Sequence, residues 1–264
     1  MRALFIALTL CLTAPAQATT LCTLVADAVS GEVLLEEGDC QSRVTPASTF
    51  KLVLAVIGFD SGVLQDPGHP VLRIQPGDPD WGGEAWRRDT APDDWMRHSV
   101  VWYSQRITRA LGGEALTDYA QALGYGNADF SGDPGFDNGL ERAWIASSLR
   151  ISPREQVRFL RGLVTGTLPV SAQAMADTRA ITEGHQVAGW TVQGKTGSAY
   201  PRRADRSFDY ARGWGWYVGW AERDGRRLVF ARLTQAENRQ SGSPGILTRE
   251  AFLQDWPALA AGFE

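Results

Sequence analysis

The chain has 264 residues, of which 44% are hydrophobic and 21% are charged. This length allows one large domain or two intimately packed ones, and the composition is that of an ordinary globular protein. The formal net charge of −4 gives no support for nucleic-acid binding, which usually shows a basic patch or stripe.

The first residues have the pattern of a secretory signal. Arg2 supplies a positive charge, residues 3–12 supply a short apolar run, and Ala16-Gln17-Ala18 fits a small-x-small cleavage site. We therefore predict a signal peptide over residues 1–18, a single folded unit over 19–264 and a periplasmic or secreted product. The alternative is a buried N-terminal segment. No stretch is long and apolar enough for a comfortable membrane span, so no stable membrane anchor is expected.

Residues 21–37 are predicted to form a β-hairpin that turns around Ser30-Gly31. This hairpin would bring Cys22 near residue 38, and therefore near Cys40. Because an exported protein reaches an oxidising compartment, we expect a disulfide between Cys22 and Cys40. Two free buried thiols are the alternative, since geometry decides whether the bond forms.

The middle of the chain carries helical patterns. Residues 48–59 are apolar around nearly the whole helix circumference, which predicts a buried helix with Ser48 or Thr49 as its cap. Residues 62–97 are rich in Gly, Pro, Asp and Trp, and we take the Gly/Trp stretch at 77–88 as a surface loop beside a cleft. Further helices are predicted at 99–111, 114–123, 154–164 (after the Ser152-Pro153 start signal) and 171–180.

Strand patterns follow after residue 183, at 187–194, 214–222 and 227–234. Asp224-Gly225 predicts a hairpin between the last two strands, and a closing helix is expected at 247–258. The predicted fold is α/β of the α+β kind: a central antiparallel sheet built from the N- and C-terminal segments and flanked by helices, with an inserted all-helical region. We expect a sheet subdomain of residues 19–62 plus 184–264 and a helical subdomain of residues 63–183.

The lysines single out two positions. Among 26 basic residues only Lys51 and Lys195 are lysine, and all the others are arginine. Lysine can lose its proton when it is buried, whereas arginine effectively cannot. Ser48 lies three residues before Lys51, so a helix would place both on one face, as a nucleophile and its base require. The N-terminus of that helix also offers unpaired N–H groups to an oxyanion.

The second lysine stands in Gly194-Lys195-Thr196-Gly197-Ser198, at the end of the predicted strand 187–194. Glycine allows a ligand to approach the backbone closely, and a cation beside a hydroxyl suits an anionic substrate. Either lysine motif alone is a weak signal. Both motifs in this order, holding the only two lysines, indicate one catalytic site.

Five short segments carry a resemblance to a known family. They are Pro46-Ala47-Ser48-Thr49-Phe50-Lys51, Ser99-Val100-Val101, Tyr125-Gly126-Asn127, Trp144 in Trp144-Ile145-Ala146-Ser147-Ser148-Leu149, and Lys195-Thr196-Gly197. Over nearly all of residues 20–258 the sequence resembles the penicillin-recognising serine enzymes and, within them, the class D β-lactamases. The resemblance implies hydrolysis of the β-lactam ring of small penicillin-type substrates through a serine acyl-enzyme.

The resemblance also implies a role for each candidate residue. Ser48 would attack the lactam carbonyl, and Lys51 would carry CO2 as an N-carboxylate and act as general base, so that bicarbonate is needed and no metal. That modification needs a neutral amine, which burial favours. Ser99 would relay a proton between Lys195 and the leaving nitrogen. Trp144 would donate a hydrogen bond to the modified lysine, and Val101 would belong to the apolar wall around it. The N–H groups of Ser48 and Ser198 would form an oxyanion hole, and the substrate would be bound by Lys195, Thr196, Gly197 and Arg249.

Other interpretations stay open. A penicillin-binding transpeptidase or carboxypeptidase shares the lysine motifs but usually has asparagine where this chain has Val101, which would make the wall around Lys51 polar. A β-lactam sensor would be acylated without turnover, and such domains are usually fused to membrane spans. A metal-dependent or Ser-His-Asp hydrolase is disfavoured, because the histidines are scattered and no G-x-S-x-G occurs. We take all three histidines as structural: His69, His98 and His185. Substrate spectrum and oligomeric state are not readable from the sequence.

Overall fold

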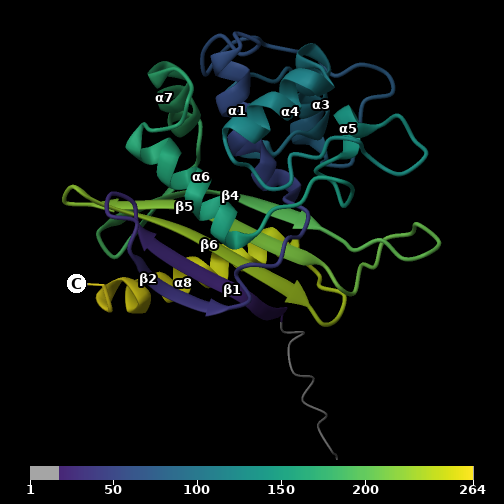
Figure 1. Ribbon diagram of the computed structural model, residues 1–264. Coiled ribbons are helices and arrows are strands. Elements are labelled where there is room, and N and C mark those ends of the chain that lie inside the picture. Colours follow the sequence, from purple (N-terminus) through teal and green to yellow (C-terminus); the bar gives the residue numbers. More distant parts are fainter. Residues whose placement is uncertain (1–17, 264) are drawn as a thin grey trace, which may run out of the picture.

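A six-stranded antiparallel sheet forms the base of the molecule (Figure 1). The computed structural model describes residues 18–263. The strand order is β2-β1-β6-β5-β4-β3, so β1, from the start of the chain, lies beside β6, from its end. The sheet is therefore assembled from both ends of the chain, as predicted. Its strands are β1 (Ala18–Asp27), β2 (Val33–Gly38), β3 (Gly184–Val187), β4 (Trp190–Ala199), β5 (Trp214–Arg223) and β6 (Arg226–Ala236).

Helices cover both faces of this sheet. Figure 1 shows most of them gathered on one side, with α6 lying against the strands, while α8 packs along the opposite face. No helix in the described part of the chain is long and apolar enough to cross a membrane. The helices are α1 (Phe50–Asp60), α2 (Pro92–His98), α3 (Val101–Leu111), α4 (Gly113–Ala122), α5 (Gly139–Arg142), α6 (Pro153–Thr165), α7 (Ala172–Ala180) and α8 (Pro244–Ala261), with short 3-10 turns η1 (Ala47–Thr49) and η2 (Glu84–Trp86).

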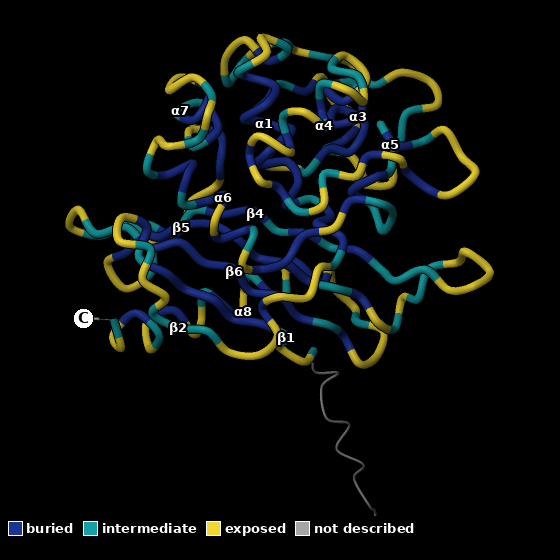
Figure 2. Tube along the Cα trace, viewed as in Figure 1, coloured by how far each residue is buried: buried dark blue, intermediate teal, exposed yellow. Residues whose placement is uncertain are grey.

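Strand β5 shows why the sheet needs cover on both sides. Trp216, Val218 and Trp220 belong to the larger core, which also contains α1. Tyr217 and Ala221 point the other way, into a smaller core with the aromatic side chains of α8. Successive side chains of a strand alternate between faces, so an apolar run of this kind is buried on both. Figure 2 shows the resulting buried layer through the middle of the sheet.

Several sequence predictions are confirmed. The N-terminal hairpin forms, and a disulfide joins Cys22 to Cys40. Asp224 and Gly225 both have positive φ in the tight turn between β5 and β6, which is the conformation that the Asp-Gly pair favours. Helix α6 begins with a capping box, in which Ser152 and Glu155 bond each other's backbone N–H groups. The predicted signal peptide lies outside the described residues, except for Ala18.

Two sequence predictions near the site are wrong in detail. The predicted strand 187–194 is two strands, because Ala188 and Gly189 form a tight turn with positive φ and so end β3. The second strand, β4, continues to Ala199, so Lys195 lies inside it and not at a strand end. The helix predicted from Ser48 begins at Phe50, directly after η1, and no side chain caps it: the Thr49 hydroxyl instead donates to the Pro46 carbonyl at 2.7 Å.

Candidate active site

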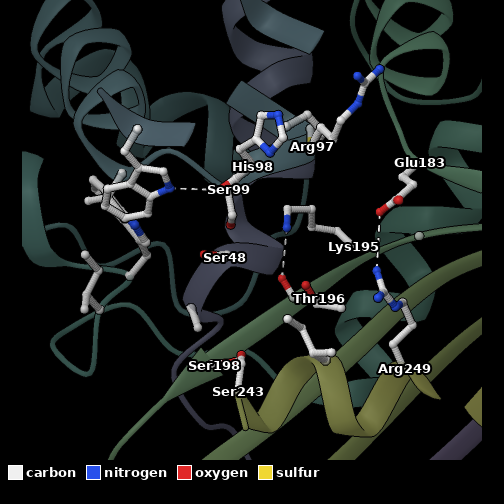
Figure 3. A pocket seen from close by; sticks show the side chains of 18 of the residues that line it. Ser48, Arg97, His98, Ser99, Glu183, Lys195, Thr196, Ser198, Ser243 and Arg249 are labelled. Atoms are coloured by element: carbon white, nitrogen blue, oxygen red, sulfur yellow. Dashed lines mark hydrogen bonds and ion pairs between the residues drawn. The ribbon is translucent and has the colours of Figure 1, made fainter. Parts of the chain in front are cut away.

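The candidate site is a cavity of about 360 Å³ between the helical layer and the edge of β4. Its wall contains most of the residues that the sequence predicted (Figure 3). Two of the predicted residues do not line it: Lys51 is fully buried, and Gly197 lies in the contact between β4 and η1. The predicted residues in the wall are Ser48, Ser99, Val101, Trp144, Lys195, Thr196, Ser198 and Arg249.

A tight turn presents Ser48 to this cavity. Ala47 has a positive φ of 50°, and the Thr49 N–H and hydroxyl both donate to the carbonyl of Pro46, at 3.2 and 2.7 Å. Ala47 and Thr49 are buried, whereas Ser48 between them is partly exposed. The turn therefore fixes the backbone on both sides of the serine and leaves its hydroxyl accessible.

Lys51 lies behind Ser48, in the first turn of α1. Its side chain is 0% exposed, and its Nζ has no hydrogen-bond partner within residues 18–263. Burial, helped by the positive charge of Lys195, holds the pKa of Lys51 well below its usual value. A lysine in these surroundings favours the neutral amine, which is the nucleophilic and proton-accepting form.

Lys195 reaches the cavity from the interior of β4. Its Nζ donates to the Thr196 carbonyl at 3.3 Å. Burial lowers the pKa of Lys195 to about 8, the Glu183 carboxylate opposes that change, and the Arg249 guanidinium adds to it. The two lysines therefore differ at neutral pH, because Lys195 keeps its proton more readily than Lys51.

Ser99 lies in the sharp bend between α2 and α3. It adopts the left-handed conformation, with a φ of 57°, as the C-cap of α2. Its Oγ is buried and has no partner among the described residues. Val101 begins α3 and is 7% exposed. A non-glycine residue held at positive φ is uncommon, and here the bend turns a hydroxyl into the cavity wall.

Trp144 stands on the loop between α5 and α6. It is 1% exposed and stacks on Phe50, with ring centroids 5.1 Å apart. Thr45 anchors the loop: its hydroxyl donates to the Trp144 carbonyl at 2.8 Å and accepts from the Ala146 N–H at 3.0 Å. The loop is thus tied to the segment that precedes Ser48.

Strand β4 fits closely against both of its neighbours at the site. A Cβ on Gly197 would lie 2.9 Å from the Pro46 carbonyl oxygen, so only glycine allows this approach. On the other side, the Ser198 hydroxyl accepts from the Gly245 N–H at 2.8 Å and contacts the Ser243 hydroxyl at 2.6 Å. These contacts place Arg249 of α8 at the same end of the cavity as Lys195.

The cavity wall also contains residues that were not predicted from the sequence. The Gly/Trp stretch is part of the wall and not merely a loop beside it, because the Trp86 indole donates to the His98 carbonyl at 2.9 Å and Trp81 packs on Trp86 at 5.4 Å. The presence of two tryptophans in a glycine-rich loop was the sequence feature that could have indicated a place in the cavity wall. No three His, Cys, Asp or Glu side chains gather like metal ligands within residues 18–263. The unassigned lining residues are Trp81, Trp86, Met96, Arg97, His98, Ile145, Glu183, Ser243 and Ile246.

Comparisons with known proteins identify the family. The family model of the penicillin-binding protein transpeptidase domain matches residues 21–252. β-Lactamase OXA-9 of Klebsiella pneumoniae is 43% identical over 242 residues, covering 91% of this chain and 88% of that protein. β-Lactamase OXA-1 of Escherichia coli is 34% identical over 213 residues, covering 79% and 74%. The crystal structure of the OXA-427 class D β-lactamase superposes with a TM-score of 0.85 at 43% identity, covering 92% of this chain and 99% of that one. The chain therefore belongs to the penicillin-binding transpeptidase family and, within it, to the class D serine β-lactamases.

Proposed function

We propose that this protein hydrolyses penicillin-type β-lactams through an acyl-enzyme on Ser48. The observation that carries the proposal is the combination of a partly exposed serine with a fully buried, unpartnered lysine one turn away on α1. Ser48 Oγ attacks the lactam carbonyl carbon, the lactam C–N bond breaks, and the ring nitrogen takes a proton. Water then attacks the ester, its C–O bond breaks, and the Ser48 hydroxyl regains a proton.

The remaining residues bind and orient the substrate in this proposal. Ser99 connects Lys195 to the leaving nitrogen and relays the proton. Lys195, Thr196 and Arg249 bind the substrate carboxylate. The backbone N–H groups of Ser48 and Ser198 receive the carbonyl oxygen as it becomes an oxyanion, with Gly197 allowing the close approach of β4.

Lys51 is the residue that we propose to carry CO2 as an N-carboxylate. The surroundings fit such a group, because Nζ is buried, has no hydrogen-bond partner among the described residues and belongs to a lysine whose pKa is strongly lowered by burial. When bound, the group supplies a carboxylate base for the protons of Ser48 and of the attacking water. Trp144 is the residue whose indole N–H would hold it, and Val101 contributes to the apolar wall.

The test compares turnover in degassed buffer and in buffer with added bicarbonate, for the wild type and Lys51→Ala, with a chromogenic cephalosporin. We expect wild-type turnover to rise with bicarbonate and the variant to lose roughly 10²–10⁴-fold in turnover, which is the usual contribution of base catalysis. Thermal unfolding shows whether Lys51→Ala still folds, and mass spectrometry shows whether Ser48 is acylated.

The opposite result has a clear meaning. Stoichiometric acylation without turnover, unchanged by bicarbonate, would replace the proposed hydrolysis with a β-lactam sensor or a penicillin-binding peptidase. Turnover that does not change with bicarbonate would support the proposed hydrolysis and contradict the N-carboxylate on Lys51.

We also propose that the protein is exported through residues 1–18 and acts in the periplasm or outside the cell. The signal-like sequence supports this, and so does the disulfide, because such bonds persist in oxidising compartments. Cell fractionation with N-terminal sequencing tests it: an extracytoplasmic product that begins at Thr19 is expected, and a cytoplasmic product that retains Met1 would contradict export.

A further inference from the structure

One acidic side chain stands among the positive charges of the cavity. Arg97, Lys195 and Arg249 supply those charges, and Glu183 is the only carboxylate among the lining residues. Glu183 Oε2 lies 3.4 Å from Nη1 of Arg249, as Figure 3 shows. The Glu183 carboxylate therefore already contacts Arg249, which we propose to bind the carboxylate of the substrate.

The ion pair between Glu183 and Arg249 has the features of one that a second carboxylate can replace. The backbone of Glu183 is fixed, because its carbonyl accepts from the Gly194 N–H of β4 at 3.1 Å. Its side chain is 46% exposed, whereas that of Arg249 is 23% exposed. The ion pair is a single long contact, unlike the short bidentate pair by which arginine holds a carboxylate firmly. A half-exposed pair of this kind is weak, so a second carboxylate can displace Glu183.

We propose that Glu183 is an internal competitor for the carboxylate-binding site, so that an anionic β-lactam must displace it from Arg249. The inference rests on the proposed function and adds a residue that sets the preference for the charge of the substrate. Glu183 opposes the substrate in two ways: it occupies Arg249, and it repels an incoming carboxylate within the cavity. It also raises the pKa of Lys195, which is about 8, so the competition is isolated at about pH 6, where Lys195 keeps its proton with or without Glu183.

The experiment uses Glu183→Gln, which keeps the shape of the side chain and removes its charge. The substrates are benzylpenicillin and its methyl ester, at low and high salt, and the acylation rate constant is measured by rapid mixing. At about pH 6, where Lys195 is protonated in both proteins, we expect acylation by benzylpenicillin to become roughly five-fold faster, as removal of a weak competing ion pair implies. The gain should be absent with the ester, and it should shrink in about 1 M salt, where screening is strong.

A matched control is Glu222→Gln. Glu222 also pairs with an arginine, Arg227, at 2.7 Å and is similarly exposed, but it does not line the cavity. This control should leave both rates unchanged. Slower acylation by benzylpenicillin in Glu183→Gln would show that Glu183 holds Arg249 in place, and an equal change with the ester would show an effect unrelated to charge. Either outcome overturns the proposal.

Acylation is measured before any turnover. The acylation rate therefore tests the competition at Arg249, whereas a failure of the later hydrolysis step would contradict only the proposed function.

Discussion

At the scale of single residues, the site depends on two lysines in different protonation states. Both are buried, and two ammonium groups in one apolar region repel each other. Lys51 is the more deeply buried and has the more strongly lowered pKa, while the carboxylate of Glu183 supports the charge of Lys195. A neutral Lys51 suits a base, and a protonated Lys195 suits a proton donor that also binds an anion.

This difference predicts a decline in activity at alkaline pH. The pKa of Lys195 is about 8, so its ammonium is present below that pH and is lost above it. We expect kcat/KM for benzylpenicillin to fall as the pH rises through about 8, because the neutral amine neither binds the carboxylate nor donates a proton. In Glu183→Gln the decline should begin at lower pH, since the Glu183 carboxylate raises the pKa of Lys195. A profile that stays flat from about pH 7 to pH 9 would contradict this assignment.

The sequence predicted the residues of the site that belong to short motifs. Ser48, Ser99 and Lys195 could be placed together because each lies in a recognisable segment, and all three line the cavity. Glu183 and His98 carry no such signal, because their position depends on how distant segments meet in the fold. A half-exposed glutamate before a strand looks like any surface residue until Arg249 of α8 is placed beside it.

At the scale of elements, the site depends on how closely β4 approaches the turn η1. Strand-like runs bounded by turn signals such as Asp224-Gly225 predicted most strands, and the Ser-Pro start signal predicted α6, because both patterns are local. The turn at Ala188-Gly189 was missed because it lies inside one continuous strand-like pattern. Short elements such as η1 and α5 were missed as well, because three or four residues carry no periodicity.

Gly197→Ala tests the approach of β4. The added Cβ would lie 2.9 Å from the Pro46 carbonyl oxygen and 3.2 Å from the Thr49 nitrogen, so β4 must move away from Ser48. We expect kcat/KM to fall by roughly 10-fold, because relief of the contact needs a movement of about half an ångström, and about 1 Å at a reacting group can cost 10²-fold. Gly113→Ala is the control: the position is in α4, it has open space around it, and activity should be unchanged. Wild-type activity in Gly197→Ala would show that β4 tolerates the movement.

At the scale of the whole molecule, the two ends of the chain form the sheet and the middle forms most of the helical layer. Residues 63–183 contribute Ser99 and Trp144 to the cavity, and the rest of the chain contributes Ser48, Lys195 and Arg249. The division into a sheet subdomain and a helical subdomain stays a prediction. The antiparallel sheet could be predicted because its strand-like runs are separated by hairpin turn signals, whereas the docking of the helices depends on side-chain shape, which no local pattern records.

The disulfide stabilises the whole molecule from a position outside the cavity. Cys22 of β1 and Cys40 after β2 are 18 residues apart, and a loop of this size implies about 3 kcal/mol from restriction of the unfolded chain. We expect wild-type protein that is reduced, unfolded and refolded to have a Tm lower by roughly 6–12 °C than the oxidised form. Its kcat/KM at 25 °C should be unchanged, because neither cysteine lines the cavity.

The reduced wild type keeps both side chains, so its comparison with the oxidised form isolates the cross-link. The double variant Cys22→Ala, Cys40→Ala should be less stable still, because both residues are at most 1% exposed and their truncation leaves space in the core. Differential scanning calorimetry measures both effects. An unchanged Tm on reduction would mean that the packing of β1 between β2 and β6 alone fixes this edge of the sheet. A loss of activity at 25 °C in the reduced protein would mean that the cross-link also fixes the geometry of the cavity.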